Sequence, residues 1–511
     1  MDSGIRRRAG EESLLYLASS SSDEDETTAL LHQRSPTPPL RGLDKTSAFT
    51  GPRSLGLVQL LSLTFFSISG GPFGMEVAVA AGGPALALLC VLTFSVFVSL
   101  PCALMTAELS SALPGRGGVV HWIDRGLSPL LGSMVSYLCL ASSTVDASAY
   151  PGVCWDYAVF CLQRWAGWPA SSFSSVGRLS FNIALTAVAL AINLAGLKLA
   201  SRAAALLAAF STAPFVTMSL LCLLRPAGSW RSMVDALSST VSRPPLDLPL
   251  VVSVCMWSSS GFEAASFVSG EVKQTGKTLP QAMGLAVVLM MAGVGVPVLA
   301  SCAILGESGG PTGWTRWSLG SFAEPAEFQG GRALGIWTCL AGVTSSLGLL
   351  NAFLCTSARN VQAMACKGLL PAWLRGETGE EGNPAPALCF SAASLLCALS
   401  FTFADLIELN MALYASALLL EQAALLRLRW REPKLRRPYR IPLGRHSLAL
   451  AYAPLIFLCL LQICYLLRSL TGAAMWLAFV LGALALARWQ IFRPAPSLAG
   501  TSSEHGQRCD K

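Results

Sequence analysis

The chain has 511 residues, of which 53% are hydrophobic and only 13% are charged, and its mean hydropathy is +0.55. This composition excludes a water-soluble globular protein and indicates an integral membrane protein. The formal net charge of +7 does not indicate nucleic-acid binding, because the basic residues follow the loops between apolar segments.

Residues 1–53 precede the first apolar segment and are rich in serine, proline and charged residues, so we expect a disordered tail. Within it, Glu26 is followed by Leu30 and Leu31 in the pattern of an acidic dileucine sorting signal. Sorting adaptors could bind such a signal and direct the protein to endosomes or lysosomes. The alternative is a tail that is only solvated, with the plasma membrane as the location.

Apolar segments long enough to cross a bilayer (about 20 residues) recur along the rest of the chain. We predict an all-α integral membrane protein with twelve transmembrane helices, at 56–81, 84–112, 128–162, 179–197, 203–224, 249–270, 281–305, 333–357, 385–404, 408–428, 448–468 and 473–492. With a cytoplasmic N-terminus, 28 of the 36 Lys and Arg residues belong to the cytoplasmic side. This bias predicts that both termini, including residues 496–511, are cytoplasmic.

The first span is interrupted by the sequence Ser-Gly-Gly-Pro-Phe-Gly at 69–74, and Glu76 follows. Glycine and proline break the helix and free backbone groups that lipid cannot satisfy, so the break must line a protein-enclosed, watery cavity. This predicts a transporter. A bare helix N-terminus attracts an anion, whereas a carboxylate there favours an ammonium group. Glu76 either neutralises the helix end or binds a cationic substrate.

The sixth span contains a second break, Trp257-Ser258-Ser259-Ser260-Gly261, and Glu263 follows it. Two broken spans, five apart, are the pattern of a five-plus-five inverted repeat with the substrate site between the broken helices. We therefore predict discontinuous helices 1 and 6 within a transporter domain over residues 54–495.

Carboxylates inside apolar spans cost about 2.5–3.5 kcal/mol at the bilayer centre, so they mark functional sites unless they are paired. Asp146 in the third span could contact substrate or take up a proton. We predict that Glu263 and Glu421, the latter deep in the tenth span, couple transport to protons. The alternative for Glu421 is a hydrogen bond to a neighbouring helix. Glu108 and Glu271 have basic loops nearby, and we expect ion pairs there.

The predicted substrate site combines both breaks with one face of the third span. Its residues are Gly70, Gly71, Phe73, Glu76, Asp146, Tyr150, Trp257, Ser258, Gly261 and Glu263. The aromatic members would form apolar or cation–π walls. The sequence has no CxxC motif, no Cys/His cluster and no nucleophile–base pair, so we expect no metal, no cofactor and no enzymatic activity.

Motifs in this order resemble those of a known family. They are the stretch at 69–76 with Gly82-Gly83-Pro84, Leu104-Met105-Thr106-Ala107-Glu108-Leu109, 117–123, Val145-Asp146-Ala147, Gly270-Glu271-Val272, Lys277-Thr278-Leu279-Pro280, Glu421 and 436–442. The chain resembles the amino acid–polyamine–organocation superfamily, most closely the polyamine:proton symporters of plants and protists. This resemblance implies alternating access in a lipid bilayer, with protons driving uptake of putrescine- or spermidine-like cations.

Two other hypotheses stay open from the sequence. A cationic or neutral amino acid transporter has the same fold, although its substrate would bring a carboxylate to the break beside Glu76. A non-transporting nutrient sensor on this fold would account for the long tail with its sorting signal.

Overall fold

The computed structural model describes residues 53–115, 117–224, 234, 246–308, 313–376, 383–396 and 402–492. All of the predicted N-terminal tail except its last residue lies outside the described residues, and so do Glu26, Leu30, Leu31 and the predicted C-terminal tail at 496–511. The described residues form helices and loops, with one isolated bridge between Leu55 and Val272.

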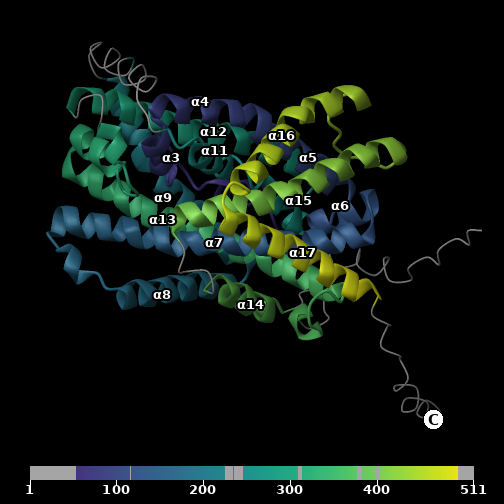
Figure 1. Ribbon diagram of the computed structural model, residues 1–511. Helices are drawn as coiled ribbons and strands as arrows, with labels where there is room; N and C mark the ends of the chain where they lie inside the picture. The colour runs from purple at the N-terminus through teal and green to yellow at the C-terminus, as the bar shows by residue number, and fades with distance from the viewer. Residues whose placement is uncertain are drawn as a thin grey trace, which may run out of the picture. The chain divides into compact units, whose positions relative to one another are not determined.

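Figure 1 shows the arrangement of the helices. In chain order they are α2 Leu57–Ile68, α3 Met75–Gly82, α4 Pro84–Phe94, α5 Leu100–Ala112, α6 Gly118–Gly126, α7 Pro129–Ala166, α8 Ser175–Leu194, α9 Leu197–Leu223, α11 Leu248–Trp257, α12 Thr275–Ser308, α13 Ala323–Cys366, α14 Ala385–Leu396, α15 Phe403–Arg431, α16 Arg445–Leu466 and α17 Leu470–Phe492. A π-helical turn, Ser95–Ser99, joins α4 to α5, and a 3-10 helix, η5, covers Phe262–Glu271.

Ten helical segments of the described residues are long and apolar enough to cross a membrane. The first and ninth predicted spans correspond to the shorter apolar helices α2 and α14. The helix of the first span is short because it stops at Ile68, where the predicted break begins. The all-α membrane architecture is thus confirmed, whereas the count of twelve spans stays a prediction.

One boundary differs clearly from the prediction. The eighth span was expected at 333–357, but α13 extends over Ala323–Cys366. Gly331, with φ of 75°, interrupts its early part, so a short helical segment precedes the main helix. In a sequence, a glycine suggests the end of a helix, because glycine readily adopts positive φ. Here the helix continues on both sides of the glycine, which the sequence does not reveal.

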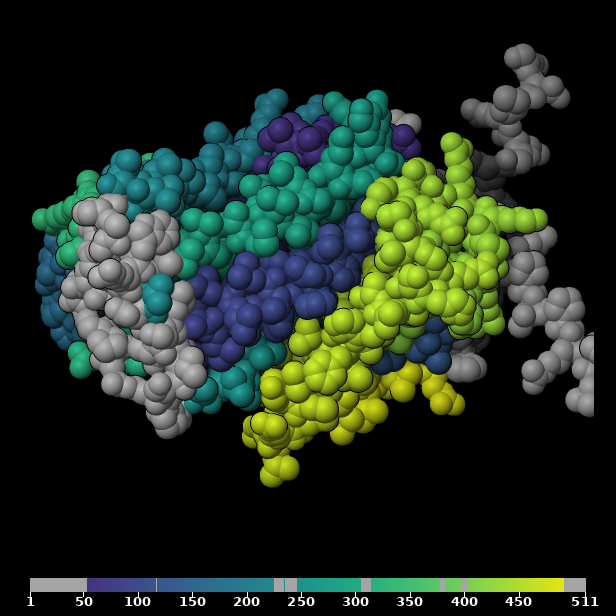
Figure 2. Space-filling model, turned by 90° about the horizontal axis from the view of Figure 1, so that it is seen from above, coloured from purple at the N-terminus to yellow at the C-terminus, as the bar shows by residue number. Residues whose placement is uncertain are grey.

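Large apolar side chains face outward on several helices, as expected for a surface in lipid. Leu206 on α9 is 74% exposed, and Leu450 on α16 is 76% exposed. Figure 2 shows α4 and α5 at the surface between α12 and α16, and Leu89 of α4 is 57% exposed. A soluble monomer would not leave so much apolar surface in water.

The inner part of the structure is built around α13, which packs against α7, α9 and α2. Glycines on α13 permit this close packing: a Cβ at Gly342 would lie 2.6 Å from the ring of Tyr157, and one at Gly348 would lie 2.4 Å from that of Phe66. Small residues at helix crossings let membrane helices approach closely. The broken first helix is therefore held against α13.

The chain entering α2 is joined to the chain leaving η5. The Leu55 N–H donates to the Glu271 carbonyl at 3.0 Å, and the Lys273 N–H donates to the Leu55 carbonyl at 2.9 Å. These two backbone hydrogen bonds form the Leu55–Val272 bridge.

Candidate functional site

The first break lies between α2 and α3. Gly70, Gly71 and Gly74 have φ values of 63°, 121° and 94°, which side chains other than glycine rarely adopt. The Gly70 carbonyl, freed by the break, accepts a hydrogen bond from the Ser345 hydroxyl of α13 at 2.9 Å. Protein groups thus satisfy backbone polarity that lipid could not.

The second break lies between α11 and η5, and it touches the first. Gly261 has φ of 99°, and a Cβ there would lie 2.1 Å from the Ser67 carbonyl oxygen of α2. The Ser99 hydroxyl of the π-helical turn donates to the freed Ser259 carbonyl at 2.7 Å. Tyr414 accepts the Gly261 N–H at 3.3 Å. Only glycine fits this crossing of the two broken helices.

A cavity of about 100 Å³ lies at this crossing. Three helix faces line it with residues three, four and seven apart, which is the spacing of one side of a helix. The lining residues are Phe66, Ser67 and Ile68 of α2; Cys139, Ser142, Ser143, Asp146 and Tyr150 of α7; Trp257, Ser260, Gly261, Glu263, Ala264 and Phe267 of the second break and η5; Leu349, Phe353, Thr356, Ser357 and Asn360 of α13; and Asn410, Met411, Tyr414, Ala417 and Glu421 of α15.

Asp146 is the centre of a hydrogen-bond network in this cavity. Its Oδ1 accepts from Trp257 Nε1 at 2.6 Å and from Asn410 Nδ2 at 3.0 Å, and its Oδ2 accepts from the Tyr150 hydroxyl. The Ser142 hydroxyl donates to the Asn410 carbonyl oxygen at 2.6 Å and orients the amide. The network holds the Asp146 carboxylate with neutral donors, and no cationic side chain of the described residues pairs with it.

The two other cavity carboxylates have fewer partners. Glu263 accepts from the Tyr414 hydroxyl at 2.8 Å. Glu421 is 1% exposed, and its Oε2 has no hydrogen-bond partner among the described residues. A buried carboxyl oxygen without a donor is costly in a folded protein.

The structure gives Glu76 other surroundings than the predicted substrate contact. It is fully buried and does not line the cavity. Its Oε2 accepts the Gly74 N–H at 2.8 Å, while its Oε1 accepts from the Tyr157 hydroxyl and from the Gly320 N–H at 3.3 Å. Glu76 therefore accepts a hydrogen bond at the start of α3, in line with the first of its two predicted roles, and joins α3 to α7 and to the loop at Gly320.

The cavity brings together five of the ten predicted substrate residues and leaves out five. Asp146, Tyr150, Trp257, Gly261 and Glu263 line it, whereas the others lie elsewhere, namely Gly70, Gly71, Phe73, Glu76 and Ser258. Phe73 packs edge-on against Tyr157 and Phe215, and the Ser258 hydroxyl donates to the Cys255 carbonyl at 3.0 Å. These contacts support the backbone around the breaks.

Asn410 and Tyr414 are the main cavity residues that were not predicted from the sequence. With Ala417 and Glu421 they fall on one face of α15, at intervals of four, three and four residues. Counting back from Glu421 in steps of three and four residues would have identified this face from the sequence. The signal is weak, because a neutral amide or phenol in an apolar helix occurs without any functional role.

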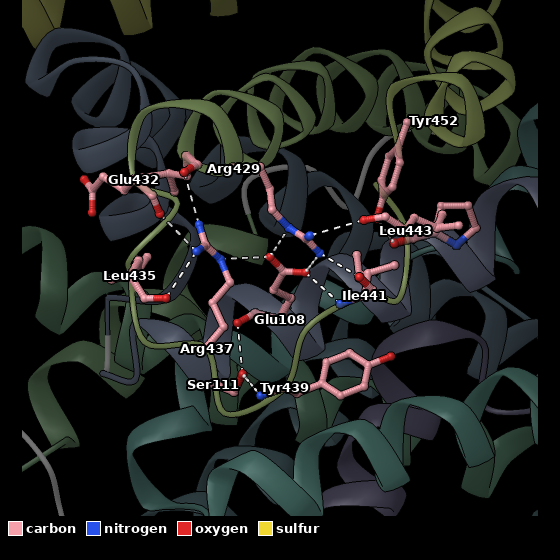
Figure 3. Close-up of polar contacts among 12 residues, drawn as sticks. Glu108, Ser111, Arg429, Glu432, Leu435, Arg437, Tyr439, Ile441, Leu443 and Tyr452 are labelled. Atoms are coloured by element: carbon pink, nitrogen blue, oxygen red, sulfur yellow. Dashed lines mark hydrogen bonds and ion pairs between the residues drawn. The ribbon is translucent and has the colours of Figure 1, made fainter. Parts of the chain in front are cut away.

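Glu108 and Glu271 form the expected ion pairs outside the cavity. Glu108 accepts from Arg429 Nε at 2.6 Å and lies 3.1 Å from Arg437 Nε, while the Ile441 N–H donates to it at 2.9 Å (Figure 3). Both arginines belong to the basic segment predicted between the tenth and eleventh spans, and the structure places Arg429 in the last turn of α15. Glu271 instead pairs with Arg359, within α13, at 2.9 Å.

A further polar cluster lies outside the membrane-spanning helices, where α6 approaches the end of α13. Asp124 accepts a hydrogen bond from Lys367 Nζ. Burial raises the pKa of Asp124 and lowers that of Lys367. Burial, with a smaller contribution from Lys367, lowers the pKa of His121 from 6.5 to about 4. His121 is therefore neutral at physiological pH.

The cavity is suited to a cation. It has three carboxylates, and none of its lining residues is Lys, Arg or His. A carboxylate and an ammonium group 4 Å apart attract by about 4 kcal/mol at the effective dielectric constant of a protein site. Within the described part of the chain, no group of His, Cys, Asp and Glu residues is arranged to hold a metal ion.

Comparison with known proteins agrees with this architecture. The model of the amino acid permease family matches residues 55–485. The polyamine transporter PUT1 of Oryza sativa subsp. japonica is 33% identical over 394 residues, which cover 77% of this chain and 70% of that protein. A probable polyamine transporter of Arabidopsis thaliana is 33% identical over 403 residues, covering 78% of this chain and 80% of the relative. The matched span contains both breaks and every cavity residue, and it confirms the resemblance to the amino acid–polyamine–organocation superfamily. The chain belongs to the amino acid permease family and is a multi-pass membrane transporter.

Proposed function

We propose that the protein is a proton-coupled secondary transporter of polyamines that works by alternating access. One observation carries this proposal: Asp146, Glu263 and Glu421, from three different elements, line one cavity without a basic residue. Such a cavity attracts a cation, and it repels the α-carboxylate of an amino acid. The names of the relatives, which are polyamine transporters, support the same substrate class.

The substrate would be an alkyl chain with an ammonium group at each end. Asp146 is our choice for the first ammonium, because its donors are all neutral and its charge stays available. Phe66, Phe267 and Phe353 supply apolar walls for the methylene groups. Trp257 and Tyr150 add aromatic surface beside the carboxylate, which suits cation–π contact.

Proton coupling would use Glu421 and Glu263. Glu421 has a carboxyl oxygen without a hydrogen-bond partner in the part of the chain that the structure describes, and Glu263 accepts from a neutral phenol that can accept as well as donate. Both line the cavity that the substrate would enter. A proton bound there and a bound ammonium group compete for the same negative charge. Binding of one therefore weakens binding of the other.

The rest of the architecture is proposed on the same basis. Residues 54–495 would form a twelve-span domain with a five-plus-five inverted repeat, flanked by the cytoplasmic tails 1–53 and 496–511. The contact of two interrupted helices at Gly261 supports this repeat. Glu26, Leu30 and Leu31 would then lie where sorting adaptors bind, which favours an endosomal or lysosomal membrane over the plasma membrane.

Uptake into proteoliposomes with an acidic outer solution tests this function. We expect uptake of labelled putrescine and spermidine, and no uptake of arginine or leucine. Uptake of arginine or leucine without polyamine uptake would refute the proposal in favour of an amino acid transporter. Absence of any uptake, with specific binding of one of these solutes, would favour a sensor.

A set of variants separates the two roles of the carboxylates. Asp146→Asn should abolish both net uptake and exchange of labelled for unlabelled polyamine. Glu421→Gln should abolish proton-driven accumulation yet retain exchange, because exchange needs no net proton movement. Glu432→Gln changes an acid in a partly exposed ion pair with Arg125 and serves as the control. Equal loss of exchange in the Glu421 and Asp146 variants would contradict separate roles.

A further inference from the structure

A second polar cavity, of about 230 Å³, lies apart from the substrate cavity. It is formed where the chain entering α2 meets the first turns of α9 and the chain leaving η5. Three of its lining residues are basic, three are neutral and polar, and none is acidic: Lys198, Arg202, Lys273, Ser54, Gln59 and Ser201. Its composition is thus opposite in charge to that of the substrate cavity.

The three basic side chains are not neutralised by the described part of the protein. Lys198, Arg202 and Lys273 are exposed, and none forms an ion pair with a described acidic residue. The half-buried Arg359 and the buried Arg429 do have such partners. Like charges around one cavity repel each other, and a bound anion would relieve that repulsion.

Neutral donors add to the positive charge. Gln59 Oε1 accepts the Gly56 N–H at 3.2 Å, so its amide NH₂ remains as a donor. Ser54 contributes a hydroxyl group, whereas the Ser201 hydroxyl donates to the Lys198 carbonyl at 3.2 Å. Orientation in the membrane requires only that basic residues lie on one side. It does not require that two separate segments, α9 and the chain after η5, bring basic residues to one cavity, or that a third segment adds hydroxyl and amide donors there.

We propose that this cavity binds a phosphate monoester group. Such a group carries a charge of about −1.5 to −2 at neutral pH and three strong acceptor oxygens. Arg202 can bind two of these oxygens through its planar guanidinium, and the two lysines add point charges. A single carboxylate has less charge and fewer acceptors to match the three cations. The group would be carried by the headgroup of an anionic lipid or by a soluble organic phosphate.

Bound phosphate would join three parts of the chain. Lys198 and Arg202 belong to α9, Lys273 follows η5, and Gln59 belongs to the first turn of α2. A ligand that binds the folded protein across these segments raises its stability in proportion to the logarithm of ligand concentration. This binding does not depend on which substrate is transported, so it is tested without transport.

The test uses the full-length protein in phosphatidylcholine nanodiscs. Thermal unfolding is followed during titration with inositol trisphosphate as the soluble probe and with short-chain phosphatidylinositol bisphosphate as the lipid probe. We expect a saturable rise in Tm with at least one probe, which weakens at high salt. Response to the lipid probe alone assigns a membrane source, and response to both assigns the phosphate chemistry itself. No rise with either probe would overturn the proposal.

Two sets of charge variants localise the binding. The triple variant Lys198→Gln, Arg202→Gln, Lys273→Gln should weaken the apparent affinity by at least about tenfold, since one charge-assisted hydrogen bond is worth about that factor. The matched control, Arg431→Gln, Lys434→Gln, Arg436→Gln, removes equal charge from exposed residues outside the cavity and should bind as the wild type does. Equal weakening in both sets would refute a defined site. The milder Arg202→Lys keeps the charge, and it should lose less affinity than Arg202→Gln.

Discussion

Glu108 allows the contribution of a buried charge to be predicted from its surroundings. Its side chain is fully buried, and those of Arg429 and Arg437 are 2% and 4% exposed. Glu108→Gln keeps the shape and the contact to the Ile441 N–H but leaves two buried guanidinium groups without a counter-charge. Removing one partner of a buried ion pair costs about 3–5 kcal/mol.

The hydrogen bonds that Arg429 and Arg437 keep set the expected loss of stability at the lower end of this range. Arg429 still donates to the Ile441 carbonyl at 3.0 Å, and Arg437 still donates to the Glu432 and Leu435 carbonyls at 3.0 and 3.2 Å (Figure 3). We therefore expect a loss of about 3 kcal/mol. The double variant Glu108→Gln, Arg429→Gln removes one of the unpaired cations and should regain at least about 1 kcal/mol of it.

Unfolding by sodium dodecyl sulfate in mixed micelles measures these free energies. Glu432→Gln is the matched control, because it makes the same chemical change in the partly exposed pair with Arg125. An exposed pair contributes about 0–1 kcal/mol. If Glu108→Gln and Glu432→Gln destabilise the protein equally, the reasoning from burial is refuted.

Three further predictions concern the site and its surroundings. Gly261→Ala should prevent stable folding or abolish uptake, because its Cβ would lie 2.1 Å from the Ser67 carbonyl oxygen at a φ of 99°; normal expression and uptake would contradict the close crossing. Tyr414→Phe should lower the kcat/KM of uptake by about 10- to 100-fold through loss of a hydrogen bond to the Glu263 carboxylate, and a change below twofold would argue against that contact in the working state. The third concerns His121, whose pKa is about 4 in the folded protein and 6.5 in the unfolded chain, so the unfolded chain binds the proton more readily. Stability should therefore fall by about 3 kcal/mol as the pH drops from 7 to 4; His121→Gln should remove that part of the loss, and parallel pH curves for the two proteins would contradict it.

The sequence was most informative where a residue is costly in lipid. The glycines of the two breaks and the carboxyl groups of Asp146, Glu263 and Glu421 stand out because a bilayer penalises freed backbone and charge. The breaks lie where they were predicted, and these three carboxylates do line one cavity. Asn410 was missed because a neutral polar side chain in an apolar helix carries a much smaller penalty.

Glu76 shows a second reason why the site could not be predicted fully from the sequence. A carboxylate next to a broken helix was expected to face either the helix end or the substrate, and local sequence cannot separate the two. Hydrogen bonds from Tyr157 and Gly320 hold the Glu76 carboxylate at the helix end. These residues are 81 and 244 positions away along the chain and meet Glu76 only in the folded protein. A contact of such sequence separation leaves no periodic pattern to detect.

The Leu55–Val272 bridge has a mechanical consequence for the transport cycle. Its two hydrogen bonds join the start of the first broken helix to the end of the second. Either these two chain ends move together during transport, or both hydrogen bonds must break at a net cost of about 1 kcal/mol each. While both bonds hold, displacement of one chain end therefore displaces the other, without any signal passing through the substrate site.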